Sequence, residues 1–206
     1  MTEETAEKVA RYIITHAPKG MDIRLDWFGG EPLYNEKVID IITSRVASAG
    51  FKFHSSMISN GYLFNEVNLK KAREEWQLRN IQITLDGTEE VYNKVKNYIY
   101  KDVNPFKTVI ENIHKLLEAN INVSIRMNAD SHNVDNLLEL IEYLNTEFPD
   151  HSNLFVYVWP IFEEGFKRTP EQRIALYNAM KVINQKLFDL NFEISNKIDG
   201  IKGLHC

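Results

Sequence analysis

The chain has 206 residues, of which 44% are hydrophobic and 26% charged, a composition typical of a soluble globular domain. Its formal net charge of −5 gives no basic surface of the kind that binds nucleic acids or anionic membranes. The longest apolar run, 154–162, is far shorter than the roughly 20 residues that cross a bilayer. With a polar N-terminus and a single cysteine, Cys206, the composition predicts a cytoplasmic protein without an internal disulfide, folded as one domain over residues 1–206.

Apolar residues at helical spacing alternate along the chain with short runs that are rich in β-branched and aromatic residues. Strands are expected at 23–28, 51–58, 81–85, 121–127 and 154–159. Helices are expected behind Thr2, through 38–49 and 66–76, behind Asn104, through 134–144, and behind the capping box that begins at Thr169. The segment 88–102 is charged and rich in tyrosine, and its pattern assigns no element.

This order gives five strand–helix units whose strands begin at intervals of roughly 30 to 40 residues, which suits right-handed parallel crossovers. The run 154–159 is apolar nearly throughout, as expected of a strand covered on both faces. The pattern predicts an α/β fold with a parallel sheet, curved as in a partial (β/α) TIM-like barrel, because a closed barrel needs about 250 residues and three more strands.

The chain opens on a helix, so we expect the first strand of this barrel to be missing. The strand 23–28 would then keep one unpaired edge, and such an edge pairs readily with another chain. We therefore expect either self-association through 23–28 or coverage of that edge by the N-terminal helix.

Glycines and short polar residues follow four of the expected strands. They are Gly29-Gly30-Glu31, Ser59-Asn60-Gly61, Thr84 with Asp86-Gly87, and Arg126 with Asn128. The carboxyl ends of parallel strands are where α/β proteins bind ligands, and adjacent glycines let the backbone approach a ligand closely. Each glycine also suits an ordinary turn, Asp86 could cap its own turn, and Arg126 could pair with a nearby carboxylate. The residues alone leave both interpretations open.

The same segments resemble those of a known family, the radical S-adenosylmethionine (SAM) enzymes. WFGGEPL at 27–33 resembles their GGEPL signature, ISNGYL at 58–63 their TNG-x-L segment, and ITLDG at 83–87 their SLDG segment. VSIRMN at 123–128 resembles the R-x-N strand of the branch with a C-terminal SPASM domain, the anaerobic sulfatase-maturing and peptide-maturing enzymes. GLHC at 203–206 is similar to the start of that domain, which implies that Cys206 is a ligand of an auxiliary cluster.

The resemblance implies a SAM site built from seven residues. They are Gly29, Gly30, Glu31, Asn60, Thr84, Asp86 and Arg126. The backbone of the two glycines, together with Glu31, would hold the methionyl amino group, and Thr84 would contact the ribose. Asn60 would shape the adenosine or substrate side of the mouth, and Arg126 would bind the SAM carboxylate. Where family members often carry an arginine after SLDG, the nearest cation in this chain is Lys96.

Enzymes of this family generate a 5′-deoxyadenosyl radical from SAM with a 4Fe–4S cluster held in a CxxxCxxC loop, and the resembling branch uses the radical to modify peptides or proteins. This chain has no such loop, and its six histidines show no metal-ligand spacing. We therefore expect the central part of a peptide-modifying radical SAM enzyme, inactive by itself. The alternative is a cluster-free SAM- or peptide-binding module of the same fold. An unrelated α/β hydrolase or isomerase is a third possibility, although the sequence contains no nucleophile elbow or phosphate loop.

Overall fold

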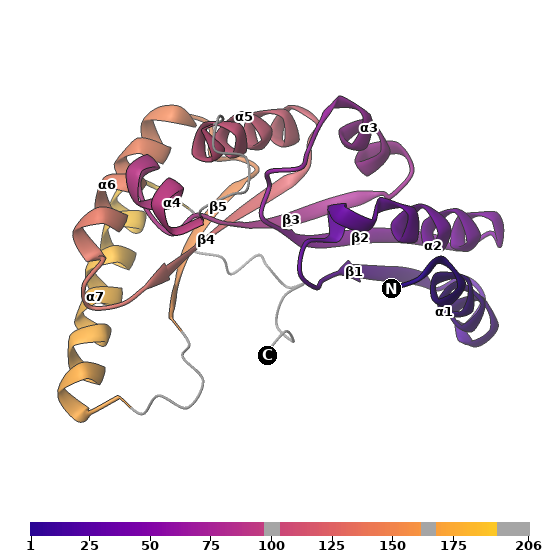
Figure 1. Cartoon of the computed structure of the whole chain (residues 1–206), viewed down its shortest axis with the longest axis horizontal. Coiled ribbons are helices and arrows are strands. Elements are labelled where there is room, and N and C mark those ends of the chain that lie inside the picture. Colours follow the sequence, from indigo (N-terminus) through magenta and orange to yellow (C-terminus); the bar gives the residue numbers. More distant parts are fainter. Residues whose placement is uncertain (97–103, 162–167, 193–206) are drawn as a thin grey trace. The chain divides into compact units, whose positions relative to one another are not determined.

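The computed structural model describes residues 1–96, 104–161 and 168–192. In these ranges five strands alternate with helices, and the strands follow chain order in one sheet, β1-β2-β3-β4-β5 (Figure 1). The strands are β1 Asp22–Trp27, β2 Lys52–Ser59, β3 Leu78–Thr84, β4 Asn122–Ala129 and β5 Leu154–Pro160. The helices are α1 Glu3–His16, η1 Pro32–Asn35, α2 Glu36–Ser48, α3 Glu66–Glu74, α4 Glu89–Lys96, α5 Pro105–Glu118, α6 Val134–Glu147 and α7 Pro170–Asp189. The predicted α/β fold with alternating strands and helices is confirmed.

The chain divides into two compact units. The first comprises Met1–Ile83 and Thr108–Val123, and the second comprises the described residues of Thr84–Lys107 and Ser124–Cys206. Each unit buries its own apolar residues: Leu25, Val46 and Ile113 lie in the first, and Leu137, Leu144 and Val156 in the second. A single domain over residues 1–206 stays a prediction.

Three helices begin at the capping residues that the sequence predicts. The Thr2 side chain accepts a hydrogen bond from Thr5 N at 3.2 Å, and Asn104 Oδ1 accepts one from Lys107 N at 3.2 Å. At α7 the predicted capping box is present in both directions, with Thr169 N donating to Gln172 Oε1 at 2.8 Å. These caps place each helix directly behind the residue that begins it.

Helix α4 lies within 88–102, the segment to which the sequence pattern assigned no element. Its single buried residue is Tyr92, whose ring meets Phe106 edge-on with the centroids 5.7 Å apart. Asn93 adds a second tie, because its Oδ1 accepts a hydrogen bond from Phe106 N at 3.0 Å. One buried side chain makes no apolar stripe, which is why helical periodicity did not reveal α4.

The pleat of β1 separates an apolar side from a polar side. Leu25 packs with buried residues of α1 and α2, and Trp27 is partly buried against the same cluster. Asp22, Arg24 and Asp26, one position out of phase, are exposed. Two side-chain contacts lie along this polar side, a hydrogen bond between His54 Nδ1 and Asp22 Oδ1 at 3.3 Å and an ion pair between Arg24 Nε and Asp26 Oδ1 at 2.9 Å. β1 is also the first strand in the sheet order, and self-association through it stays a prediction.

Strand β5 departs from the expectation that both of its faces are covered. Leu154, Val156 and Val158 are buried, whereas Phe155 and Tyr157 are only half-buried and Trp159 is 46% exposed. The expectation was wrong because an aromatic ring counts as apolar in a sequence run even where one of its sides reaches solvent. β5 therefore alternates, as β1 does.

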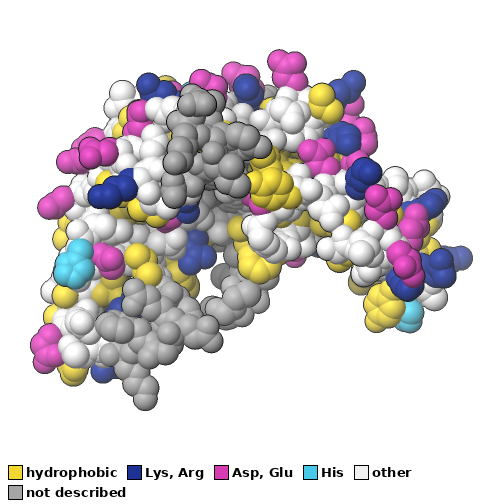
Figure 2. All heavy atoms as spheres, in the orientation of Figure 1, with side chains coloured by type: hydrophobic (Ala, Val, Ile, Leu, Met, Phe, Trp, Pro, Cys, Tyr) yellow, Lys and Arg dark blue, Asp and Glu magenta, His cyan; other side chains and the backbone are white. Residues whose placement is uncertain are grey.

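Among the described residues, no helix is long and apolar enough to span a membrane. On the face shown in Figure 2, acidic and basic side chains intermingle over α1 and α2. Arg45 Nη2 lies 2.8 Å from Glu7 Oε1, and this hydrogen-bonded pairing lowers the pKa of Glu7. The paired charges leave no field of one sign on these two helices.

A partly buried hydrogen-bond network fixes α3 against α2 in the first unit. The fully buried Trp76 donates its indole N–H to Asp40 Oδ1 at 2.7 Å, and Lys71 Nζ lies 2.7 Å from Asp40 Oδ2. The hydrogen bond to Asp40 raises the pKa of Lys71. The indole has a single N–H donor, and in this structure that donor bonds to Asp40. Removing the Asp40 carboxylate would therefore leave a buried N–H without an acceptor.

We predict that Asp40→Ala lowers the free energy of unfolding by about 2–3 kcal/mol, because it leaves the Trp76 N–H without an acceptor and removes the nearer carboxylate partner of Lys71. Asp40→Asn should cost only about 1 kcal/mol, since the amide oxygen can still accept from the indole. Urea denaturation monitored by tryptophan fluorescence measures both. Equal losses in the two variants would show that the indole bond contributes nothing.

Candidate functional site

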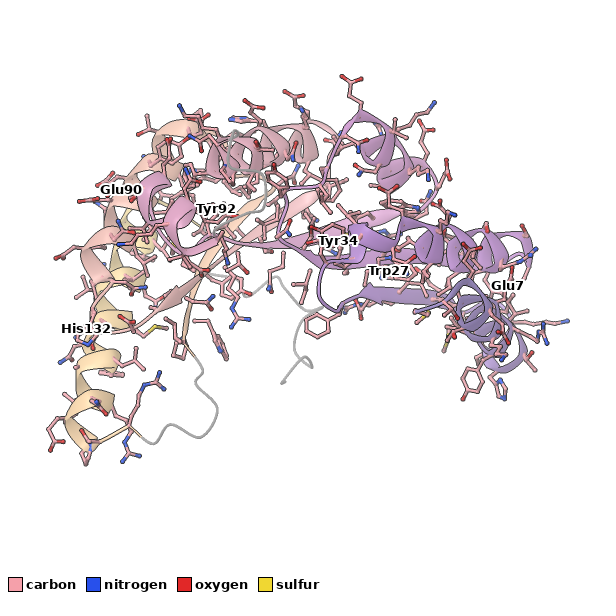
Figure 3. The ribbon with its side chains drawn as sticks, viewed as in Figure 1. Glu7, Trp27, Tyr34, Glu90, Tyr92 and His132 are labelled. Carbon is pink, nitrogen blue, oxygen red and sulfur yellow. The ribbon has the colours of Figure 1, made fainter. Side chains whose placement is uncertain are left out.

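An open glycine turn follows β1 in the first unit. Gly29 has φ +146°, and a Cβ added at Gly29 or Gly30 would have no atom within 4 Å. Phe28 and Tyr34, on either side of the turn, are 57% and 74% exposed, and Figure 3 shows Tyr34 on η1. The backbone of this turn is thus accessible to a ligand, and large aromatic side chains flank it.

The carboxylate of Glu31 joins the end of β1 to the end of β2. Its Oε1 accepts hydrogen bonds from Ser59 Oγ at 2.9 Å and from Leu33 N at 3.2 Å, while Oε2 accepts one from Asn60 N at 2.7 Å. A carboxylate oxygen can accept two hydrogen bonds, so Oε2 keeps one position for a further donor. Glu31 is therefore held in place while retaining the capacity to bind a cation.

The Asn60-Gly61 turn after β2 is fixed by its own side chains. Asn60 Oδ1 accepts a hydrogen bond from Tyr62 N at 2.8 Å, and Ser59 Oγ accepts one from Gly61 N at 3.0 Å. Gly61 has φ +76°, and a Cβ there would lie 3.0 Å from Ile83 Cδ1 and 3.2 Å from Val109 Cγ1. Only glycine suits both the backbone conformation and the space.

Asp86 lies in the second unit, just beyond the half-buried Thr84 that ends β3. Asp86 Oδ2 lies 2.8 Å from Lys96 Nζ of α4, and Asp86 Oδ1 accepts a hydrogen bond from Asn128 Nδ2 of β4 at 2.8 Å. The described partners of this carboxylate are therefore side chains from two other elements, α4 and β4. These two contacts link elements of the second unit and do not cap the turn at Asp86 itself.

Arg126 of β4 belongs to the same group of side chains. Its Nε donates to Asn128 Oδ1 at 3.1 Å, and its backbone oxygen accepts from Leu85 N at 3.0 Å. Among the described residues the two Nη nitrogens have no hydrogen-bond partner, and no carboxylate pairs with this guanidinium. Burial raises the pKa of Tyr157 on β5, and the charge of Arg126 opposes that rise.

The predicted residues therefore fall into two groups. The first unit brings Gly29, Gly30 and Glu31 together with Asn60, through the hydrogen bond from Asn60 N to Glu31. The second unit brings Asp86 and Arg126 together through Asn128, with Thr84 two residues before Asp86. Cys206, predicted as an auxiliary-cluster ligand, lies outside the described residues.

Sequence reasoning missed three residues that hold these groups: Ser59, Lys96 and Asn128. Ser59 and Asn128 were quoted in the polar motifs, and their position one or two residues from Asn60 and Arg126 was the available signal. Lys96 was considered only as a substitute for an arginine. Its pairing with Asp86 depends on α4, which the sequence did not reveal.

Comparison with known proteins decides the family. The model of the radical SAM superfamily matches residues 1–144. The chain belongs to the radical SAM superfamily. No curated protein matches it.

Solved structures share the fold of this radical SAM chain at low sequence identity. A tagged form of anSMEcpe with bound AdoMet has a TM-score of 0.64 and 16% identity, over 92% of this chain and 51% of that one. Streptococcus suis SuiB has a TM-score of 0.61 and 11% identity, over 94% of this chain and 42% of that one. SuiB bound to its precursor peptide SuiA has a TM-score of 0.57 and 12% identity, over 90% and 40%. The chain thus spans about half the length of these proteins or less.

The family implies SAM and a 4Fe–4S cluster, and the two fit this chain differently. A cluster needs several thiolates, but the sequence has one cysteine, and the described residues contain no group of three His, Cys, Asp or Glu side chains able to hold a metal ion. The residues present therefore do not fit the cluster. Taken unit by unit, an ammonium such as that of SAM matches the remaining acceptor position of Glu31 in the first unit, and a carboxylate matches the Nη nitrogens of Arg126 in the second.

We predict that Glu31→Gln lowers the free energy of unfolding by about 1–3 kcal/mol. The carboxamide replaces one acceptor oxygen with an NH₂ group, which would then face another N–H or O–H donor. Chemical denaturation measures the change. Glu118→Gln, which removes the same charge from an exposed position of α5, should be nearly neutral. If both variants were equally stable, the contacts of Glu31 would not hold the two loops.

Replacing Gly61 separates packing from backbone strain. Gly20→Ala, at φ +83° with nothing within 4 Å, should cost about 1 kcal/mol of unfolding free energy, from conformation alone. Gly61→Ala, at φ +76° against Ile83 and Val109, should cost about 2–3 kcal/mol, because the collision adds to the same strain. Thermal denaturation compares the two variants. An equal loss of unfolding free energy in the two variants would mean that Ile83 and Val109 move aside without cost.

Proposed function

We propose that this chain is the SAM-holding part of a radical SAM enzyme that modifies a peptide or protein. The observation that carries the proposal is the glycine turn after β1. It has no atom within 4 Å of either Cβ position, and the carboxylate of Glu31, with an acceptor position left, is fixed beside it. An ammonium group approaching Gly29 and Gly30 would find backbone carbonyls and a charge of opposite sign.

In this proposal the residues divide the SAM molecule between them. Glu31 with the backbone of Gly29 and Gly30 takes the methionyl amino group, and Arg126 takes the carboxylate through its Nη nitrogens. Thr84 contacts the ribose. Asn60, whose side chain is used within its own turn, sets the shape of the loop on the adenosine or substrate side. Asp86 is linked through Asn128 to Arg126, the residue proposed to bind the SAM carboxylate.

The proposed substrate is a peptide or protein, whose side chain or backbone would be cross-linked, oxidised or epimerised in the full-length enzyme. Two solved structures with this fold support the substrate class, since anSMEcpe holds the Kp18Cys peptide in one and SuiB holds its precursor peptide SuiA in the other. The resemblance of 203–206 to the start of a SPASM domain extends the proposal to Cys206 as an auxiliary-cluster ligand. A reducing, cytoplasmic setting fits the lone cysteine.

The chain alone is proposed to bind SAM weakly and not to cleave it, because it has no CxxxCxxC loop and SAM loses its contact with iron. The single cysteine equally favours a second candidate, a cluster-free SAM- or peptide-binding module. The two candidates differ in affinity. A module that binds SAM without iron should do so at micromolar concentration, whereas a scaffold without its cluster should need roughly millimolar SAM.

Saturation-transfer NMR, which detects millimolar binding, and titration calorimetry test the proposal on the 206-residue chain. We predict a signal from SAM near millimolar concentration, weakened roughly tenfold by Arg126→Met and unchanged by Lys181→Gln on the exposed side of α7. Anaerobic incubation with SAM and dithionite should yield no 5′-deoxyadenosine. Formation of that product would overturn the claim of inactivity, and equal binding by Arg126→Met would overturn the carboxylate assignment.

A further inference from the structure

The amide of Asn128 can take only one orientation. Its Nδ2 lies 2.8 Å from Asp86 Oδ1, and its Oδ1 lies 3.1 Å from Arg126 Nε. A carboxylate only accepts hydrogen bonds and a guanidinium only donates them. If the amide were rotated by half a turn, its NH₂ would face a donor and its oxygen a carboxylate. The two neighbours together therefore fix which way Asn128 points.

The orientation of Asn128 in turn fixes the guanidinium of Arg126. Asn128 Oδ1 accepts the hydrogen bond from Arg126 Nε–H, so the guanidinium plane is held from one side. With no partner among the described residues, the two Nη nitrogens at the far end remain as a pair of parallel donors, the geometry that binds a carboxylate through both of its oxygens. Without the Nε contact the side chain would be free to sample other rotamers, and binding would have to order it.

Asp86 is itself held by another element of the second unit, the helix α4. Lys96 Nζ lies 2.8 Å from Asp86 Oδ2 and 5.8 Å from the ring centroid of the buried Tyr92. Figure 3 shows Tyr92 on α4. Asp86 is thus clamped between Lys96 and Asn128, and the charges along the chain of contacts read cation, carboxylate, amide, cation.

From these contacts we infer that Asp86 is a positioning residue: it acts through Asn128 to aim the Arg126 guanidinium at the carboxylate of a bound ligand. The ligand identity rests on the proposed function, in which that carboxylate belongs to SAM. The inference differs from direct ligand contact because it assigns Asp86 a role through its two partners within the protein, Lys96 and Asn128. It also gives a role to Asn128 and Lys96.

The variant Asp86→Asn distinguishes positioning from simple electrostatics by the sign of its effect. Loss of a negative charge near the site would by itself favour the carboxylate of SAM, so electrostatics alone predicts tighter binding. Positioning predicts weaker binding, by roughly tenfold, because Asn128 is no longer forced to present its oxygen to Arg126. Decarboxylated SAM, which keeps the amino group and lacks the carboxylate, should bind both proteins with nearly the same affinity.

A readout without any ligand follows the ¹⁵Nε–Hε resonance of Arg126, assigned by its disappearance in Arg126→Lys. In the wild-type chain this proton should exchange slowly, and in Asp86→Asn and Asn128→Leu at least about tenfold faster. The exchanged pair Asp86→Asn/Asn128→Asp should restore slow exchange, because a carboxylate at 128 again accepts from Nε and an amide at 86 can donate to it. Glu139→Gln, at an exposed position of α6, changes the net charge equally and should leave the resonance unchanged.

The outcomes separate the two ideas. If the wild-type chain bound SAM no better than decarboxylated SAM, the carboxylate assignment of the proposed function would fail, while the resonance of Arg126 would still decide the positioning role. If Asp86→Asn left both the exchange rate and the preference for SAM unchanged, positioning by Asp86 would be wrong. Tighter binding of SAM by Asp86→Asn would assign the residue a purely electrostatic effect.

Discussion

The pleat of a parallel strand sends consecutive side chains to opposite faces, and in this chain the two faces differ in chemistry. In β1 Leu25 and Trp27 face the helices, whereas Arg24 and Asp26 do not. Parallel sheets covered on both faces consist of nearly continuous hydrophobic runs, whereas β1 and β5 alternate; β3 and β4 each bury three consecutive residues. In β1 the helix-facing half therefore joins the core, and the polar half is left for other tasks. Polar residues at the strand ends can then serve binding without displacing any core side chain.

Carboxylates at the strand ends turn this arrangement into fixed geometry. Glu31 accepts from the backbone of Asn60 and the hydroxyl of Ser59, and Asp86 accepts from Lys96 and Asn128. A glycine turn has more conformational freedom than any other, so a neighbouring residue must hold it if it is to bind a ligand repeatedly in one shape. Within each unit, the carboxylate that the sequence suggests as a ligand-binding group also holds neighbouring elements together through hydrogen bonds.

The sequence predicted the fold better than the contacts of the site. Runs of β-branched and aromatic residues between helical patterns revealed all five described strands, because each strand contains buried apolar residues. They did not reveal α4, which a single buried tyrosine anchors. For the site, glycines and acidic residues behind strands were visible as residue types. The pairing of Asp86 with Lys96 and Asn128 was not, because it depends on where α4 and β4 lie in space and not on spacing along the chain.

The contacts that prepare Glu31 and Arg126 come entirely from within this chain, and no thiolate takes part in them. In the proposed function, holding the two charged ends of a methionyl group and ligating iron would therefore be separate tasks of different residues. Iron would add the strength of a coordination bond, while the side chains described in this chain would supply orientation. It follows that weak binding of SAM by the chain would reflect a missing bond and not a disordered site, because the hydrogen bonds that hold Glu31 and Arg126 are already made before any ligand arrives.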